Sequence, residues 1–300
     1  MTRKTGAGFN TIVAAIGECT GTPFQALSVK PVSGCSIHRA WHLDDGVRHY
    51  FVKTGPVAAA PMFAAEAEGL LALSATAAVA TPTFVTQGEA GGEAYLVLEH
   101  LELEGLDQAG GTRLGSALAD LHRNRGDAFG WPADNFIGAT PQTNTPHLSW
   151  PHFFGDRRLR PQLELALRNG MDRVLVAKGH AIVERIGGLF IDYRPAPSLL
   201  HGDLWSGNAA QTRAGVPVIF DPACYYGDRE ADIAMAELFG GFPLSFHAAY
   251  RSAWPLDAGY EERRPLYNLY HILNHFNLFG GAYLGQAQRM IERLLAGLKR

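Results

Sequence analysis

The sequence predicts an α+β protein with two lobes: a small lobe built on an antiparallel sheet with one inserted helix, and a larger, mainly helical lobe. Three observations support this prediction. Short apolar runs separated by turn residues fill positions 26–100, as is typical of an antiparallel sheet. Helical periodicity dominates the rest of the chain. Hydrophobic residues make up 47% of the 300 residues, enough to bury a sizeable core. We therefore expect an N-terminal lobe at 1–102 and a C-terminal lobe at 103–300.

The N-terminal lobe is predicted to begin with three strands. Val29–Val32 is the first, and a turn at Ser33–Gly34 leads into Ser36–Leu43, which alternates in polarity. Asp44–Gly46 is a strong hairpin signal because Asp-Gly pairs favour tight turns. The third strand is then His49–Lys53.

One helix and two further strands complete the predicted sheet. The alanine-rich segment Val57–Ala75 reads as a helix that ends before Pro82. Phe84–Thr86 and Ala94–His100 read as strands on either side of a turn at Ala90–Gly92. The expected result is a five-stranded sheet with the helix inserted after its third strand.

The C-terminal lobe is predicted to be mainly helical. Thr112–Arg123 reads as a helix with Thr112 as its cap, and the proline-rich stretch 126–151 reads as loop. Leu199–Asp203 and Pro217–Asp221 are short apolar strands that each end in an aspartate. The remaining helical segments are Gln162–Arg168, Asp172–Tyr193 and the chain beyond Asp228, with breaks at Pro243, Pro255 and Gly280–Gly281.

Composition excludes several classes of function. The net charge of −3 lacks the basic excess expected of a nucleic-acid-binding protein. The three cysteines, Cys19, Cys35 and Cys224, form neither a C-x-x-C pair nor a zinc pattern. The apolar run Ile12–Ile16 is too short for a signal peptide or a membrane span. We expect a cytoplasmic protein that does not act on membranes.

Two carboxylates and an amide have the spacing that phosphoryl transfer requires. Asp203 and Asn208 are five residues apart, and Asp221 follows thirteen residues later, after an apolar run. The first spacing matches the H-R-D-x-x-x-x-N loop of protein kinases, and His201 stands where that motif has histidine, although Gly202 replaces the arginine. A base plus two oxygen ligands for Mg²⁺ is the set that a kinase needs. Each aspartate alone would equally suit a helix cap or a turn.

A second predicted pair is Lys53 with Glu66. Lys53 ends the third strand, where a kinase lysine would meet the phosphates of ATP. Glu66 shares one helix face with apolar residues that must pack on the sheet, so its buried carboxylate needs a cation. That face contains Ala59, Met62, Phe63, Glu66, Leu70 and Leu73. The alternative is that Glu66 lies at the solvated edge of the stripe.

Two backbone segments are candidates for nucleotide binding. The turn Ser33, Gly34, Cys35 and Ser36 precedes Lys53 and can offer backbone N–H groups to phosphate, although an ordinary hairpin explains it equally well. The segment after the fifth strand would join the lobes, and the backbone of Glu99 and Leu101 would bind adenine there.

Two polar clusters are less specific. Asp228, Arg229, Glu230 and Asp232 open a helix, where acidic residues are electrostatically favoured. His271, Asn274 and His275 share one face of an apolar helix, which is compatible either with satisfied core residues or with a site lining. The i, i+4 histidines have metal-ligand spacing, but no third ligand accompanies them.

The residue sequence of these motifs resembles that of the fructosamine-3-kinase (ketosamine kinase) family, which is related to aminoglycoside and choline phosphotransferases. The similar stretches are Trp131–Gly138 (WPADNFIG), His201–Asn208 (HGDLWSGN), Phe220–Met235 (FDPACYYGDREADIAM) and Leu266–Gly280 (LYNLYHILNHFNLFG). The resemblance spans roughly residues 10–295. It implies a protein-kinase-like fold and ATP- and Mg²⁺-dependent phosphorylation of the C3 hydroxyl of a ketosamine, a deglycation repair.

The resemblance also implies roles for individual residues. Asp203 would be the base, Asn208 and Asp221 the Mg²⁺ ligands, and Lys53 with Glu66 the phosphate clamp. The other implied positions are the acceptor-side residues Trp205 and His275 and the loop supports His201 and Asp232.

Several alternatives stay open. Cys35 in the phosphate-binding turn could form a redox-linked dimer, whereas the default is a monomer with an inert thiol. A kinase for an aminoglycoside or another amino sugar is the nearest rival function, and a catalytically silent pseudokinase is the second. The sequence does not identify the preferred sugar, nor whether the ketosamine is a small molecule or is attached to a protein.

Overall fold

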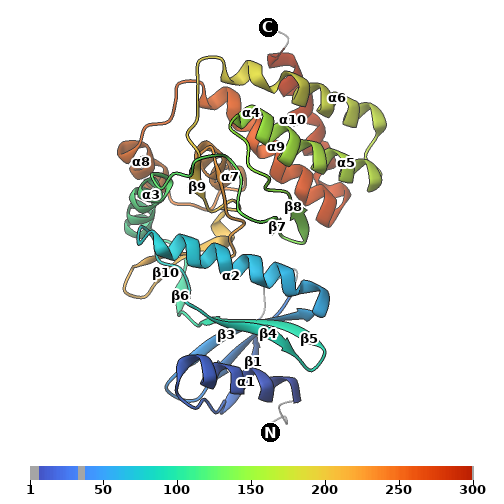
Figure 1. Cartoon of the computed structure of the whole chain (residues 1–300). Helices are drawn as coiled ribbons and strands as arrows, with labels where there is room; N and C mark the ends of the chain where they lie inside the picture. The colour runs from blue at the N-terminus through green and yellow to red at the C-terminus, as the bar shows by residue number, and fades with distance from the viewer. Residues whose placement is uncertain (1–6, 33–37, 299–300) are drawn as a thin grey trace.

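The computed structural model describes residues 7–32 and 38–298, which form two lobes (Figure 1). The N-terminal part, coloured blue to teal, is an antiparallel sheet with helices, and the green to red remainder is mainly helical. The predicted α+β class with a small sheet lobe and a larger helical lobe is therefore confirmed.

The small lobe is one five-stranded antiparallel sheet between two helices. Its elements are α1 (Ala7–Thr20), β1 (Ser28–Val32), β2 (Arg39–Asp44), β3 (His49–Pro56), the 3₁₀ turn Val57–Ala59, α2 (Ala60–Ala75), β4 (Phe84–Ala90) and β5 (Glu93–Glu99). The strand order is β1-β2-β3-β5-β4. The predicted hairpin turns at Gly46, whose φ of 88° suits glycine. The sequence analysis predicted all five strands and α2 but missed α1.

The alternation of β5 explains why both faces of the sheet carry a helix. Tyr95 and Val97 pack with Ile12 and Ile16 of α1 in one buried cluster. Leu96 and Leu98 point to the other face, where they pack with Phe63 and Leu70 of α2. Within the described part of the chain, Val57–Ala75 is the one helix long and apolar enough to cross a membrane, but Figure 1 shows it lying along the sheet.

The larger lobe is built around helices that share one apolar core. Its helices are α3 (Gln108–His122), α4 (Trp150–Phe154), α5 (Arg160–Arg168), α6 (Arg173–Arg185), α7 (Glu230–Leu238), α8 (Leu244–Ala253), α9 (Tyr260–Phe279) and α10 (Leu284–Gly297). A π-helical turn at Gly155–Leu159 joins α4 to α5, and 3₁₀ turns occupy Ile186–Phe190, Ser206–Asn208 and Gly281–Tyr283. The predicted breaks at Pro243, Pro255 and Gly280–Gly281 all fall between helices.

Short strands of the larger lobe frame the cleft between the lobes. They are β6 (Leu103–Glu104), β7 (Asn135–Ile137), β8 (Thr140–Gln142), β9 (Ser198–Leu200), β10 (Ala209–Thr212), β11 (Pro217–Ile219) and β12 (Tyr225–Gly227). Only β9 and β11 correspond to predicted strands. We propose that the lobes divide near residue 102, because β6 directly after it pairs with β10 of the larger lobe.

One predicted helix start is wrong. The helix predicted at Thr112 begins at Gln108, and its cap is Asp107, whose Oδ1 accepts a hydrogen bond from the Gly110 amide. Two glycines, Gly110 and Gly111, occupy the first turn, and their low helix propensity concealed it. A capping aspartate compensates because it satisfies an amide that the first turn leaves unpaired.

Candidate active site

The predicted catalytic loop lies between two small sheets of the larger lobe. It follows β9, which pairs with β12, and it leads into β10, which pairs with β11. Asp221 comes two residues after β11. Because the loop and the end of β11 emerge side by side, Asp203, Asn208 and Asp221 all line one cleft.

Asn208 joins the two aspartates. Its Nδ2 donates to the Asp203 carbonyl at 3.0 Å, to Asp203 Oδ2 at 3.3 Å and to the Asp221 carbonyl at 3.5 Å. Its amide oxygen takes no hydrogen bond from the described residues. Asp221 has a φ of 56°, a left-handed conformation that is uncommon outside glycine and often found at functional sites. The oxygens of Asn208 and Asp221 therefore fit a hard divalent cation.

Lys53 pairs with Glu66, as predicted. Its Nζ lies 2.7 Å from Glu66 Oε1 and 2.9 Å from Oε2. Only 13% of the Glu66 side chain is exposed, so the solvated-edge alternative is wrong. Lys53 Nζ also lies 2.6 Å from Asp221 Oδ1, across the cleft, a contact that the sequence did not predict.

Burial and charge set the protonation of this trio. Burial alone would lower the pKa of Lys53, but the Asp221 and Glu66 charges outweigh it and raise that pKa above its ordinary value. Burial would raise the pKa of Asp221, whereas Lys53 holds it below its ordinary range. Burial dominates at Glu66 and raises its pKa. Lys53 therefore stays positively charged at neutral pH. Its ammonium group could bind a phosphate group in addition to a carboxylate.

The Asp203 carboxylate can accept a proton at a pH near 7. Burial, together with the negative charges of Asp221 and Asp232, raises the pKa of Asp203 to about 7. A general base is most effective when its pKa lies near the working pH. The geometry thus gives Asp203 the proton affinity of a base, which its sequence position alone does not reveal.

Asp232 holds the backbone of the loop. Its Oδ2 accepts from the His201 amide at 2.8 Å and its Oδ1 accepts from the Gly202 amide at 2.9 Å. His201 Nε2 donates to the Phe220 carbonyl at 2.9 Å, so His201 ties the loop to the strand end that carries Asp221. These contacts support the loop-supporting roles expected for His201 and Asp232.

The conformation of the catalytic loop at position 202 requires glycine. Its φ is 84°, and a Cβ there would lie 2.1 Å from the Ala223 carbonyl oxygen. The missing side chain lets the Ala223 amide donate to the His201 carbonyl at 2.8 Å. The glycine that replaces the kinase arginine therefore allows the loop to lie directly against the segment after Asp221.

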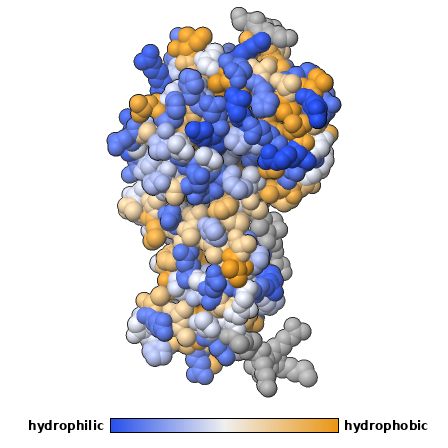
Figure 2. All heavy atoms as spheres, turned by 45° about the vertical axis from the view of Figure 1, so that its right-hand side comes forward, coloured by the Kyte–Doolittle hydropathy of each residue, from blue (hydrophilic) through white to orange (hydrophobic). Residues whose placement is uncertain are grey.

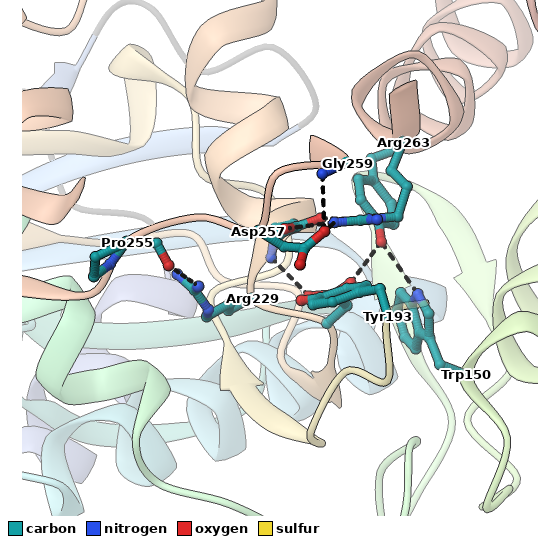
Figure 3. Close-up of polar contacts among 10 residues, drawn as sticks. Trp150, Tyr193, Arg229, Pro255, Asp257, Gly259 and Arg263 are labelled. Carbon is teal, nitrogen blue, oxygen red and sulfur yellow. Dashed lines mark hydrogen bonds and ion pairs between the residues drawn. The ribbon is translucent and has the colours of Figure 1, made fainter. Parts of the chain in front are cut away.

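A buried polar network anchors α7 and with it Asp232 (Figure 3). Arg263 Nε donates to Glu230 Oε2 at 2.8 Å, and its Nη2 donates to Asp257 at 2.7 Å. Arg263 also stacks 3.8 Å from the Tyr193 ring centroid. Glu230 and Asp232 do lie in the first turn of α7, as predicted, but both are buried. Their hydrogen-bond and ion-pair partners, in addition to the helix dipole, compensate for the cost of burying the two carboxylates.

The same network includes Asp228 and Arg229. Asp228 accepts from Tyr267 at 2.6 Å and from Tyr193 at 2.9 Å. Arg229 donates to the Pro255 carbonyl at 2.5 Å, a contact drawn in Figure 3. Each residue of the Asp228–Glu230 segment therefore has a hydrogen-bond partner from a distant part of the chain.

The cleft between the lobes has a volume of about 1200 Å³. Figure 2 shows the surface narrowing between the larger lobe at the top and the smaller lobe below. Among its described lining residues, Lys53 is the one lysine or arginine, and the acidic ones are Glu66, Glu99, Glu102, Asp203 and Asp221.

The linker end of the cleft fits a nucleotide base. Glu99 and Leu101 both line it, beside the apolar side chains of Phe51, Leu98 and Phe220. The Glu99 amide donates to the Thr83 carbonyl at 2.8 Å, whereas the Leu101 backbone makes no hydrogen bond to the described residues. The backbone N–H and C=O of Leu101 are therefore without partners among the described residues, which is compatible with the predicted contact to adenine. The predicted phosphate-binding residues Ser33, Gly34, Cys35 and Ser36 lie outside the described residues, so the loop and redox hypotheses stay predictions.

The opposite end of the cleft contains Trp205 and His275, as expected. His275 Nδ1 donates to the His271 carbonyl at 2.8 Å. His271, which belongs to the predicted polar face of this helix, has its Nδ1 3.9 Å from Asp203 Oδ1, without a hydrogen-bond partner among the described residues. The described part of the chain contains no group of three or more His, Cys, Asp or Glu residues that could hold a metal ion, so no such third ligand accompanies His271 and His275 there.

Comparison with known proteins identifies relatives along the whole chain. The family model described as fructosamine kinase matches residues 8–297. A "Probable ketoamine kinase" of Synechocystis sp. is 47% identical over 290 residues, covering 96% of this chain and 97% of the relative. The chloroplastic protein-ribulosamine 3-kinase of Arabidopsis thaliana is 40% identical, over 93% of this chain and 86% of the relative.

Solved structures agree on the architecture. A crystal structure assigned as a fructosamine-3-kinase from Haemophilus somnus has a TM-score of 0.88 at 30% identity, covering 96% of this chain and 98% of that one. An aminoglycoside phosphotransferase has a TM-score of 0.60 at 16% identity, over 96% of this chain and 99% of that one, and so shares the fold alone. The protein-kinase-like fold that the sequence predicts is thereby confirmed.

Proposed function

The chain belongs to the fructosamine kinase family, and we propose that it transfers the γ-phosphoryl group of ATP to the C3 hydroxyl of a ketosamine. A ketosamine is a sugar condensed onto an amine. The observation that carries the proposal is the placement of Asp203, Asn208, Asp221 and Lys53 around one cleft, where a base, oxygen ligands and a phosphate-binding cation meet.

Asp203 takes the proton in the proposed reaction. The acceptor hydroxyl oxygen bonds to the γ-phosphorus as the bond from that phosphorus to the bridging oxygen breaks, and ADP leaves. The hydroxyl proton passes to Asp203. Lys53 holds the phosphates, and Glu66 holds Lys53. Phosphoryl transfer depends mainly on such positioning and charge neutralisation.

Asn208 and Asp221 would hold Mg²⁺. The side-chain Oδ1 of Asn208 accepts no hydrogen bond from the described residues, and 47% of the Asp221 side chain is exposed. When bound, the cation neutralises charge that develops on the phosphates. Lys53 would then exchange its bond to Asp221 for one to phosphate.

The product explains a repair role. Phosphate leaves carbon more readily than hydroxide does. Transfer of a proton from C1 to the C2 ketone oxygen gives a C1–C2 enol, from which phosphate leaves C3, and water then hydrolyses the resulting C1 imine and releases the amine. We place this deglycation activity in the cytoplasm. The sugar and the attached amine, free or on a protein, are what the first assay must establish.

The acceptor end of the cleft favours a ketosamine over an aminoglycoside. An aminoglycoside carries several ammonium groups, which need carboxylates when they are desolvated. Of the acidic residues that line the described cleft, Asp203 and Asp221 belong to the reaction centre, Glu66 pairs with Lys53, and Glu99 and Glu102 lie at the linker end. A pseudokinase is disfavoured because Lys53, Asp203 and Asp221 are all present.

Phosphate transfer to a panel of acceptors tests the function. With Mg²⁺ and ATP, we expect phosphorylation of fructosyl-lysine or ribulosyl-lysine, and ³¹P–¹H correlation spectra should place the phosphate on C3. Aminoglycosides at equal concentration serve as the alternative acceptors. Turnover of aminoglycosides alone would establish the rival kinase, and binding of ATP without transfer to any acceptor would establish the pseudokinase.

The activity should rise with pH through the titration of Asp203. A base must be deprotonated, and the pKa of Asp203 is raised to about 7, so the protonated, inactive form dominates below that value. Bound Mg²⁺ lowers this pKa because a nearby cation favours the carboxylate. We expect kcat at saturating MgATP to have an acidic limb above about 4, the ordinary aspartate value, and no higher than 7.

The affinity for MgATP, measured at each pH, is the control for this profile. A kcat that is independent of pH down to about 4, at constant MgATP affinity, would contradict the assignment of Asp203 as the base.

A further inference from the structure

A chain of contacting aromatic rings lines the acceptor end of the cleft. Its members, here called the aromatic wall, are Trp205, Phe239, His275, Phe279 and Tyr283. The ring centroid of His275 lies 4.9 Å from the ring centroid of Phe239, 5.1 Å from that of Tyr283 and 5.6 Å from that of Phe279. Trp205 continues the series at 6.5 Å from Phe239.

The wall is assembled from separate parts of the chain. Trp205 belongs to the catalytic loop, Phe239 directly follows α7, and Tyr283 lies in the 3₁₀ turn before α10. His275 and Phe279 lie one helical turn apart near the end of α9. Several elements therefore converge to present ring surface at one place.

Three of these rings are partly exposed to solvent, unlike the side chains of a hydrophobic core. Trp205 is 39% exposed, Phe239 40% and Phe279 52%, although all three lie in a cleft. Clustered apolar side chains that stay in contact with water typically mark a binding surface. The exposed side of the wall faces the volume that an acceptor would occupy.

The wall adjoins the reacting group. Trp205 is two residues after Asp203. His275 is one turn beyond His271, whose Nδ1 lies 3.9 Å from Asp203 Oδ1. When the C3 hydroxyl is at Asp203, the amine on C1 lies only two carbons away. The amine and its substituent are therefore within reach of the wall.

The chemistry of the wall suits a cation without a carboxylate partner. Burial lowers the pKa of His275, so its ring is neutral at pH 7, and the bond from Nδ1 to the His271 carbonyl leaves Nε2 as an acceptor. The faces of Trp, Tyr and Phe rings attract cations electrostatically. A secondary alkylamine is protonated at neutral pH and carries an apolar chain, which matches both properties of the wall.

We propose that the aromatic wall binds the protonated secondary amine of the ketosamine and its alkyl chain through cation–π and apolar contacts. The wall thereby selects amine adducts over neutral sugars of the same shape. This inference rests on the proposed function, because it assumes that the acceptor is a ketosamine. It assigns recognition of the amine to Phe239 and Phe279, together with Trp205.

Two acceptors that differ in one atom test the proposal. The first is the fructosamine of an alkylamine, and the second replaces its nitrogen with an ether oxygen and is uncharged. Dissociation constants for both are measured calorimetrically in the presence of Mg²⁺ and an ATP analogue that cannot transfer phosphate. The proteins compared are wild type, Phe239→Leu, Phe279→Leu and Phe239→Tyr, with Phe9→Leu as the control because Phe9 lies on α1, away from the cleft.

Leucine keeps the apolar bulk and removes the ring face. We expect Phe239→Leu and Phe279→Leu to weaken binding of the amine about tenfold and binding of the ether less than about twofold. Phe239→Tyr keeps a ring face and should therefore bind the amine more tightly than Phe239→Leu does, whereas Phe9→Leu should bind both acceptors as wild type does. An equal loss for both acceptors, or no loss for the amine, would overturn the proposal. Phosphorylation of the same fructosamine by the wild-type enzyme tests the proposed function separately.

Discussion

Replacing Asp203 with asparagine is expected to lower kcat by about three orders of magnitude while MgATP still binds. Asparagine keeps the size of the side chain but cannot take the hydroxyl proton. The contacts of Asp203 with Asn208 are few, so the loop should keep its shape through Asp232 and Gly202. Phosphate transfer to the ketosamine and calorimetric binding of MgATP measure the two effects separately.

Asp192→Asn is the matched control for this variant. Asp192 is exposed, and the same exchange of charge there should leave kcat unchanged within about twofold, as is usual for surface positions. Turnover by Asp203→Asn comparable to wild type would remove Asp203 from the role of base. Loss of MgATP binding together with turnover would indicate a damaged loop.

Replacing Arg263 with methionine is expected to reduce the free energy of unfolding by about 3–5 kcal/mol. The change leaves the Glu230 carboxylate, whose side chain is fully buried, without its cation. An unpaired buried charge costs more than the pair contributes. Denaturant titration measures the loss, and the melting temperature should fall by roughly 6–10 °C.

The neighbouring arginine supplies the control. Arg264 pairs with Glu237 and Glu261 but is 33% exposed, so Arg264→Met should cost no more than about 1 kcal/mol. Adding Glu230→Gln to Arg263→Met should recover part of the stability because no charge is then left unpaired. Equal losses for Arg263→Met and Arg264→Met would show that the burial of the Arg263–Glu230 pair is energetically unimportant.

Local patterns made the catalytic loop predictable. Asp203 and Asn208 are close in sequence, and Asp221 ends an apolar run. Their spacing was therefore enough to predict that the three side chains belong to one site. The Lys53–Glu66 pair followed from one helix face and one strand end. The five strands of the small lobe followed from alternation and turn residues, which are properties of short segments.

Contacts between distant segments were not predictable in this way. The bond from Lys53 to Asp221 joins residues 168 positions apart, and the approach of His271 to Asp203 depends on how α9 packs behind the loop. The aromatic wall draws on four segments of the chain, and of its rings only Trp205 and His275 were expected at the acceptor side. Helix α1 was missed because its apolar run is short and its partner, the face of the sheet, lies far along the chain.

The ion pair between Lys53 and Asp221 also bears on how the cleft fills. It spans the two lobes, and it places a cation and an anion against each other where a nucleotide and its metal would enter. A metal–nucleotide complex can exchange partners with this pair, phosphate going to Lys53 and metal to Asp221, so no charge is stranded. Bare nucleotide would leave Asp221 unpaired, and bare metal would draw Asp221 away from Lys53. We therefore expect this ion pair to favour the binding of metal and nucleotide as one complex.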